Sequence, residues 1–300
     1  MVRYVNLSLD GRQGAVARVG HPMARGVEFS ATDGGEAMDN GFEGQVILVT
    51  GAGRGLGRAA AARFATAGVR VAMADVNGES AREGAEALSS FAETHPIEVD
   101  VADAASVGGM VDEVIARFGQ IDVLVHCAGI ARGAGQRKED GSWLPMEQVS
   151  EADWRAVIEI NLTGTFLVNR AVASVMIPAG YGRIVNVGSM SGMIANKGLP
   201  GLGPYAASKG GVIALTTVLA VEWADHGITV NCISPGYMAT EMGKRSQSIP
   251  GFRDLQLSST PLGRLGEPSE FAHAVSYLAS REAAFITGHN LVIDGGYTAW

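Results

Sequence analysis

An apolar run followed at once by a glycine-rich turn is the feature that most constrains the fold of this chain. Residues 45–50, Gln-Val-Ile-Leu-Val-Thr, predict a buried strand, and the alanine-rich residues 58–67 predict the helix that follows it. The turn has the spacing Gly-x-x-x-Gly-x-Gly, at Gly51, Gly55 and Gly57. Leu56 stands where the strict Gly-x-Gly-x-x-Gly spacing would place its third glycine. Because this unit presents free N–H groups at a helix start, it predicts a dinucleotide site.

A carboxylate at the end of the next predicted strand indicates which dinucleotide binds. Residues 69–74 form that strand, and Asp75 follows it, 18 residues after Gly57. A carboxylate here is expected to accept hydrogen bonds from the ribose hydroxyls and to repel a 2′-phosphate, which favours NAD over NADP. Arg54 in the glycine loop favours the opposite choice, but it would equally serve the pyrophosphate or solvent. The alternative role for Asp75 is a turn or helix N-cap residue.

Tyr205 and Lys209 are four residues apart in a predicted helix, so their side chains share one face. A phenol ionises near pH ~10, so a tyrosine that acts as a base near neutral pH needs its pKa lowered by about 3 units. An ammonium group close by supplies a shift of that size. The pair therefore predicts proton transfer by the tyrosine.

Further motifs occur in a fixed order along the chain. They are Asp100-Val101, Asn161-Leu162-x-Gly164, the run 182–189 ending in Ser189, the run 231–236 ending in Pro235-Gly236, and Ile293-Asp294-Gly295-Gly296. Together with the glycine loop and the Tyr-x-x-x-Lys pair, this set resembles the short-chain dehydrogenase/reductase family from about residue 43 to the C-terminus. The resemblance implies a single-domain α/β Rossmann fold with a doubly wound parallel sheet of about seven strands.

The resemblance also implies a role for each motif residue. Ser189 is expected to hydrogen-bond the substrate oxygen, and Tyr205 to move the proton. Lys209 is expected to lower the tyrosine pKa and hold the nicotinamide ribose, while Asn161 holds a water that relays protons. The implied cofactor contacts are Gly51, Arg54, Gly55, Leu56, Asp75, Asp100, Val101, Ala128, Gly129, Tyr205, Lys209, Pro235, Gly236, Met238 and Thr240.

Two departures from the family pattern are visible. The chain has His126-Cys127-Ala128-Gly129 where the family commonly has Asn-Asn-Ala-Gly, which places local packing in question more than catalysis. Ser189 and Tyr205 are 16 residues apart, a few more than is usual. We expect the enlarged loop 196–201 to border the active site.

Composition excludes several other functions. The 300 residues include 47% hydrophobic residues, and no uninterrupted apolar run of 18 residues offers a membrane span. A net charge of −8 opposes binding to nucleic acid. The two cysteines indicate a reducing compartment, hence the cytoplasm, and the six histidines show no metal-ligand spacing.

Apolar runs alternate with amphipathic segments along the rest of the chain. Further strands are expected near 96–100, 121–127, 182–188, 228–234 and 289–293, and helices near 103–118, 151–178, 204–224 and 267–280. We assign residues 41–300 to the catalytic domain, with an exposed loop at 131–149 and a substrate lid at about 237–262. Residues 1–40 have no counterpart in the family. They are expected to be a weakly ordered extension or a short hairpin, and Met38 is an alternative start.

The substrate is expected to be a secondary alcohol or ketone. Within the family, the segments 219–224, 235–242 and 294–300 look most like those of enzymes that oxidise polyols or reduce keto sugars. Ser191, Asn196 and Tyr237 would offer polar groups to such a substrate. A 3-oxoacyl-carrier-protein reductase is the alternative enzyme, and a silent dinucleotide sensor or scaffold the alternative of another class. The family's homotetramer is expected through the helices at 151–178 and 204–224.

Overall fold

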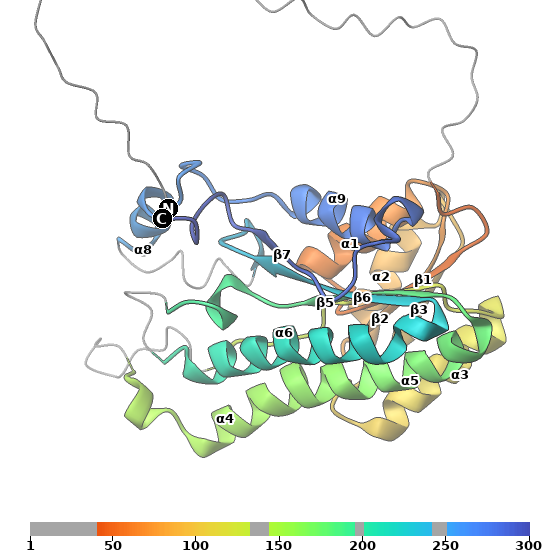
Figure 1. Cartoon of the computed structure of the whole chain (residues 1–300), viewed down its shortest axis with the longest axis horizontal. Helices are drawn as coiled ribbons and strands as arrows, with labels where there is room; N and C mark the ends of the chain where they lie inside the picture. The colour runs from red at the N-terminus through yellow and green to blue at the C-terminus, as the bar shows by residue number, and fades with distance from the viewer. Residues whose placement is uncertain (1–40, 133–143, 196–200, 242–250) are drawn as a thin grey trace, which may run out of the picture. The chain divides into compact units, whose positions relative to one another are not determined.

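The computed structural model describes residues 41–132, 144–195, 201–241 and 251–300, which belong to one compact unit, Asp39–Trp300 (Figure 1). The expectations for residues 1–40 and Asn196, for most of the loop 131–149 and for the middle of the expected lid fall outside these ranges.

Seven strands of the described residues form one parallel sheet in the order β3-β2-β1-β4-β5-β6-β7. They are β1 (Val46–Thr50), β2 (Arg70–Asp75), β3 (Thr94–Glu98), β4 (Val123–His126), β5 (Gly182–Val187), β6 (Ile228–Pro235) and β7 (Asn290–Ile293). The direction of strand progression reverses between β1 and β4, where open parallel sheets bind their ligands. The expected fold class is confirmed.

Helices cover both faces of the sheet, which explains why β1, β4, β5 and β6 are buried along their whole length. One face carries α1 (Gly55–Ala65), α2 (Gly78–Leu88) and α9 (Pro268–Ala279). The other carries α3 (Ala104–Phe118), α5 (Gly164–Ala179) and α6 (Gly203–Trp223), with α4 (Glu151–Ile158) continuing into α5. Figure 1 shows these two layers on opposite sides of the strands.

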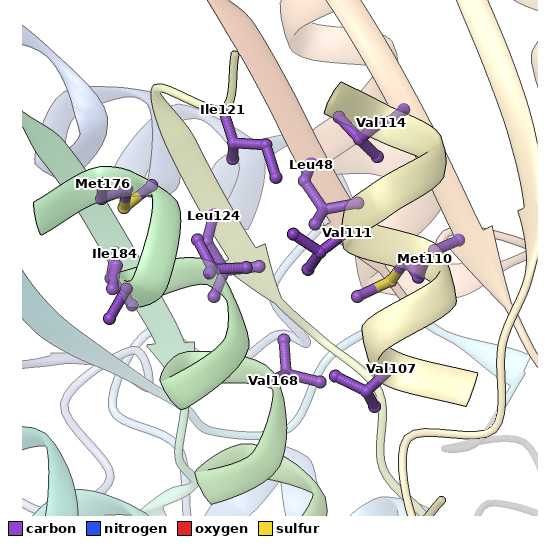
Figure 2. Packing of buried hydrophobic residues seen from close by; sticks show 14 of the residues in the cluster. Leu48, Val107, Met110, Val111, Val114, Ile121, Leu124, Val168, Met176 and Ile184 are labelled. Carbon is purple, nitrogen blue, oxygen red and sulfur yellow. The ribbon is translucent and has the colours of Figure 1, made fainter. Parts of the chain in front are cut away.

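The larger hydrophobic cluster lies under α3, α5 and α6. Figure 2 shows Val107, Val111 and Val114 of α3 directed toward Leu48 of β1 and Leu124 of β4. Each of these five side chains is at most 5% exposed. Fully burying one such side chain contributes about 1.5–3 kcal/mol, so this face holds the sheet rigid beneath the loops at its carboxyl edge.

Three local features differ from the sequence expectation. Helix α2 was not expected, because its buried positions are mostly alanine and glycine and give a weak apolar stripe. Helix α8 (Phe252–Ser258) lies in the expected lid, where no helix was predicted. The long helix at 151–179 is not uniform, because residues Glu159–Thr163, labelled η2, form a π-helical turn between α4 and α5.

Two helical stretches of the described residues, Glu151–Ala179 and Gly203–His226, are long and apolar enough by composition to span a membrane. Both contribute side chains to the sheet core, including Val168 and Met176 from the first and Leu219 and Trp223 from the second. Packing within the domain therefore accounts for part of their apolar character.

Candidate active site

The residues singled out in the sequence gather at the carboxyl edge of the sheet. Thr50 and Asp75 are the last residues of β1 and β2, and Pro235 is the last residue of β6. Ala128 follows β4, and Ser189 follows β5. Because parallel strands end at one edge, residues that are far apart in sequence face a common site.

The glycine loop is shaped by close backbone approaches. A Cβ on Gly51 would lie 2.8 Å from the backbone nitrogen of Ala128, and one on Gly57 would overlap the carbonyl of Gly51. Gly55, at φ +59°, opens α1. Arg54 occupies the N-cap position with an exposed side chain that makes no capping hydrogen bond. The free N–H groups at the start of α1 therefore suit a pyrophosphate, and the loop fits a dinucleotide.

Asp75 is held by two backbone groups. Its Oδ2 accepts a hydrogen bond from Gly53 N at 2.8 Å, and its Oδ1 accepts one from Asn77 N at 3.0 Å. The N-cap of α2 is Asn77, whose side chain accepts from Ser80 N at 3.0 Å. Asp75 is thus not the N-cap of α2, but its bond to Asn77 N gives it the turn role that the alternative also named. Each carboxylate oxygen keeps lone-pair capacity for a hydroxyl donor.

Tyr205 and Ser189 lie next to each other. The two hydroxyl groups are hydrogen-bonded, and Ser189 Oγ also accepts from Ser191 N at 3.1 Å. Burial raises the pKa of Tyr205, and the hydrogen bond from Ser189 opposes that rise. The expected lowering of the tyrosine pKa by Lys209 is wrong for this structure, because desolvation of the phenolate dominates.

Lys209 lies beside the tyrosine but is anchored elsewhere. Its Nζ is 5.8 Å from the centroid of the Tyr205 ring and donates a 2.6 Å hydrogen bond to the carbonyl oxygen of Val187. Burial lowers its pKa to about 8, and negative charge on Cys232 or Cys127 would oppose that change. An ammonium group has three donors, so the Val187 bond leaves two for other partners.

The π-helical turn places Asn161 in the protein interior. Its Oδ1 accepts from Ile130 N at 2.8 Å, and its Nδ2 donates to Ile130 O at 2.9 Å and to Ser208 Oγ at 3.0 Å. A Cβ on Gly129 would lie 3.2 Å from Asn161 Oδ1 and 3.5 Å from Lys209 Nζ. The amide therefore fixes the chain after β4 against α6, next to the lysine.

His126 takes up a buried structural role in the neighbouring strand. Its Nδ1 is 2.8 Å from Thr50 Oγ1, while its Nε2 is buried without a hydrogen-bond partner. Burial, assisted by the charge of Lys209, lowers its pKa to about 3. Burial raises the pKa of the Cys127 thiol to about 12, and both cysteines are free. The histidine at this position thus links β4 to β1.

The residues after β6 are placed by contacts with other segments. Met238 is buried and forms an isolated parallel bridge with Gly266, and Thr240 N donates to Met238 O. Gly236 packs against Asp294, where a Cβ would lie 2.6 Å from Asp294 Cβ. After β3, Asp100 is exposed and its Oδ1 accepts from Ala102 N, while Val101 is buried.

Tyr237 packs among other aromatic side chains. Its ring packs edge-to-face on Tyr297 at 5.4 Å and on Phe252 at 6.0 Å between centroids. Its hydroxyl is hydrogen-bonded to that of Tyr297, and burial raises its pKa. The hydroxyl that was expected to serve the substrate already has a protein partner.

Three residues of the site region were missed in the sequence. Gly53 contacts Asp75, Arg58 bonds the loop that contains Gly53, and Tyr297 pairs with Tyr237. The Gly-x-Gly start of the loop marks Gly53, and the arginine four residues after Arg54 lies one turn along the same helix. Nothing in the sequence pattern marks Tyr297.

Comparison with known proteins supports what the geometry indicates. Residues 51–298 match the family model described as Enoyl-(Acyl carrier protein) reductase. A short-chain type dehydrogenase/reductase from Mycobacterium marinum has a similar structure, with a TM-score of 0.78, 35% identity, and coverage of 87% of this chain and 98% of that one. The chain belongs to the short-chain dehydrogenase/reductase family.

Curated relatives include polyol dehydrogenases and acyl-carrier-protein reductases. D-threitol dehydrogenase of Mycolicibacterium smegmatis is 44% identical over 262 residues, 87% of this chain and 95% of the relative. Galactitol 2-dehydrogenase (L-tagatose-forming) of Cereibacter sphaeroides is 40% identical, with 86% and 97% coverage. The 3-oxoacyl-[acyl-carrier-protein] reductase FabG of Escherichia coli is 38% identical, with 85% and 98% coverage. The short-chain dehydrogenase/reductase described here is an oxidoreductase that acts on CH–OH groups with a nicotinamide dinucleotide.

Proposed function

We propose that this short-chain dehydrogenase/reductase is an NAD-dependent dehydrogenase of polyols or keto sugars. The similarity to D-threitol and galactitol dehydrogenases supports this substrate class. The carboxylate of Asp75, held at the end of β2 by Gly53 and Asn77, supports NAD. It offers acceptors to two ribose hydroxyls and would repel a 2′-phosphate.

The catalytic groups in this proposal are Ser189, Tyr205 and Lys209, with Asn161 in support. Bound NAD supplies a hydride acceptor at C4 of its nicotinamide ring. Ser189 and Tyr205, already hydrogen-bonded to each other, hold the oxygen of the secondary carbinol. Tyr205 takes the hydroxyl proton as the hydride leaves, and returns it in the reverse direction.

Lys209 supports this step by its charge and position. The raised pKa of Tyr205 means that ionisation must be assisted when substrate and dinucleotide bind. The two donors that Val187 leaves on the ammonium group are available to the nicotinamide ribose and to the proton path. Asn161 holds the backbone at Ile130 through two hydrogen bonds. We propose that the water that relays protons binds next to Asn161.

The substrate contacts in this proposal come from the segments that border Ser189. Ser191 is two residues after Ser189, and Asn196 lies between Ser189 and Tyr205 in the sequence. The remaining cofactor contacts are those that the family resemblance implies, with Met238 and Thr240 near the nicotinamide carboxamide.

A direct assay tests the substrate class. Purified protein is incubated with NAD or NADP and a panel of D-threitol, galactitol and other polyols, and separately with NADPH and 3-oxoacyl thioesters. The change in reduced nicotinamide is followed at 340 nm. Oxidation of polyols with NAD supports the proposal. Activity confined to 3-oxoacyl thioesters with NADPH would replace it with the acyl-carrier-protein reductase. Tight NAD binding without turnover of any substrate would favour a silent sensor.

The acyl-carrier-protein reductase is a second candidate because FabG covers nearly the same length at 38% identity. The charge of this chain argues against it, since acyl carrier protein is acidic and the net charge here is −8. Asp75 argues against the phosphorylated cofactor.

We also propose a cytoplasmic homotetramer. Val218 and Val221 on α6 are 59% and 78% exposed, and Phe166 on α5 is 42% exposed, so these helices carry apolar surface toward solvent. Light scattering of the purified protein tests this assembly, and a monomer at micromolar concentration would contradict it.

A further inference from the structure

Arg58 joins the glycine loop to the first turn of α2. Its Nη2 donates hydrogen bonds to the carbonyl oxygens of Gly53, at 3.1 Å, and Ser80, at 3.0 Å. The arginine lies on α1, one turn into that helix, so its guanidinium reaches back over the loop. Its Nε is buried without a hydrogen-bond partner, and the two carbonyl contacts therefore place the group.

Gly53, which Arg58 holds, is one of the two residues whose N–H groups contact Asp75. Gly53 donates its N–H to Asp75 Oδ2 at 2.8 Å, and its carbonyl accepts from Arg58. A Cβ at Gly53 would lie 2.8 Å from Asp75 Oδ2 and 2.9 Å from Ser80 Cβ, so the loop and the carboxylate are in close contact. A displacement of the arginine would therefore be transmitted through a single residue to the carboxylate.

A helical glycine marks the space that the guanidinium occupies. Gly84 is buried in the interior of α2, where glycine is less favourable than alanine. A Cβ there would lie 2.7 Å from Arg58 Nε, 2.8 Å from Arg58 Cζ and 2.8 Å from Met73 Cε. The absence of a side chain at this position thus leaves room for the arginine.

We infer that Arg58, seated over Gly84, is a specificity-positioning residue that holds Gly53 and Asp75 in the arrangement that favours NAD over NADP. This inference rests on the proposed function, in which Asp75 binds the ribose hydroxyls. Two hydroxyls require a carboxylate at a fixed place, whereas repulsion of a phosphate depends only on its charge being near. Displacing Arg58 is therefore expected to weaken NAD binding while the exclusion of NADP, which depends on the charge of Asp75, changes little.

Gly84→Ala is the sharpest test, because it keeps every charge and inserts one methyl group against the guanidinium. Gly109→Ala is the matched control, since it makes the same change inside α3 where a Cβ meets nothing within 4 Å. Arg58→Met removes the contact itself, and Arg82→Met is its control, an exposed arginine on α2. Dissociation constants for NAD and NADP are measured by calorimetry on each folded variant, together with Tm.

Gly84→Ala is expected to lower the NAD-over-NADP affinity ratio about fivefold, which corresponds to about 1 kcal/mol, while Gly109→Ala leaves it unchanged. The Arg58→Met/Gly84→Ala double variant should show the ratio of Arg58→Met alone, because both changes act through one guanidinium. Equal ratios in Gly84→Ala and Gly109→Ala, or effects that multiply in the double variant, would overturn the inference. If Gly84→Ala does not fold, the affinity ratios of Arg58→Met and Arg82→Met are compared instead. Equal ratios in these two variants would overturn the inference.

The wild-type measurement separates this inference from the proposed function. A wild-type protein that binds neither nucleotide, or that binds NADP more tightly, contradicts the proposed NAD preference before any variant is compared, and the inference falls with it. A wild-type protein that prefers NAD, with a ratio unaffected by Arg58→Met and Gly84→Ala, contradicts the role of Arg58 alone.

Discussion

Tyr237 and Tyr297 are joined both by their rings, which pack edge-to-face at 5.4 Å, and by a hydrogen bond between their hydroxyl groups. Tyr237 follows β6 at the base of the expected lid, and Tyr297 lies in the C-terminal segment. The segment is further tied to residues before α9 by the bond from Leu262 N to Gly295 O. The two tyrosines therefore connect the chain end with the border of the site.

This pairing predicts matched effects of Tyr237→Phe and Tyr297→Phe. Each removes one partner of a single hydrogen bond, so each should lower the free energy of unfolding by about 1 kcal/mol, and the double variant should lose little more. Urea unfolding measures this, and the KM for the polyol should be similar in both variants. A KM that rises in Tyr237→Phe but not in Tyr297→Phe would indicate that the Tyr237 hydroxyl contacts the substrate.

Tyr205→Phe is expected to lower kcat by at least about 10²-fold while the Kd for NAD stays within about twofold, because the ring is retained and only the proton carrier is lost. Stopped-flow or steady-state rates, with calorimetry for NAD, check both values. Ser189→Ala should reduce kcat as well, since it removes a donor to the developing oxyanion. Substantial turnover by Tyr205→Phe would exclude tyrosine as the general acid/base.

Asp75→Ala is expected to narrow the preference between NAD and NADP by roughly tenfold, since it removes both the acceptor for the hydroxyls and the charge that opposes phosphate. The ratio of kcat/KM for the two cofactors is the measurement. Arg54→Ala serves as the comparison. If the ratio of kcat/KM for the two cofactors is unchanged in Asp75→Ala but changed in Arg54→Ala, the arginine determines the cofactor selectivity.

His126 predicts a loss of stability in mild acid. Its pKa is about 3 in the fold and 6.5 in the unfolded chain, so between these values the unfolded state binds a proton that the folded state does not. Its contribution to stability is therefore complete above about pH 6.5 and falls by about 1.4 kcal/mol per pH unit below it. Urea unfolding of wild type and His126→Asn at pH 7, 6 and 5 checks this. Parallel pH dependences would show that the imidazole does not carry the effect.

A chain that begins at Met38 is expected to keep its activity and its Tm. The residues of the site and both hydrophobic clusters lie between Phe42 and the C-terminus. Assay and thermal unfolding of the truncated protein test this expectation, and failure of the truncated protein to fold would assign residues 1–37 a structural role.

Sequence patterns revealed the parts of this molecule that depend on local chemistry. The β-branched runs predicted the strands because parallel strands are apolar on both faces, and Gly51 and Gly57 predicted the turn because backbone approaches leave no room for a side chain. Helix α2 was not predicted because its buried face consists largely of alanines and glycines. The π-helical turn at Asn161 was not predicted because no residue preference indicates such a turn.

Properties set by burial or by distant partners were beyond the sequence. The pKa of Tyr205 depends on how far the phenol is desolvated, which four-residue spacing does not reveal. The partner of the Tyr237 hydroxyl comes from the far end of the chain. Arg58 was overlooked because its role becomes visible only when Gly53, Ser80 and Gly84 are seen around it.

The π-helical turn at Glu159–Thr163 constrains how this family member can vary in length. It contains one residue more than a regular turn would need, and Asn161 lies within it. Deleting one residue there would rotate α4 by about 100° relative to α5 and withdraw the amide from Ile130. Insertions and deletions should therefore be tolerated less in this segment than in the loop before α4, although the sequence of residues 151–179 resembles one uninterrupted helix.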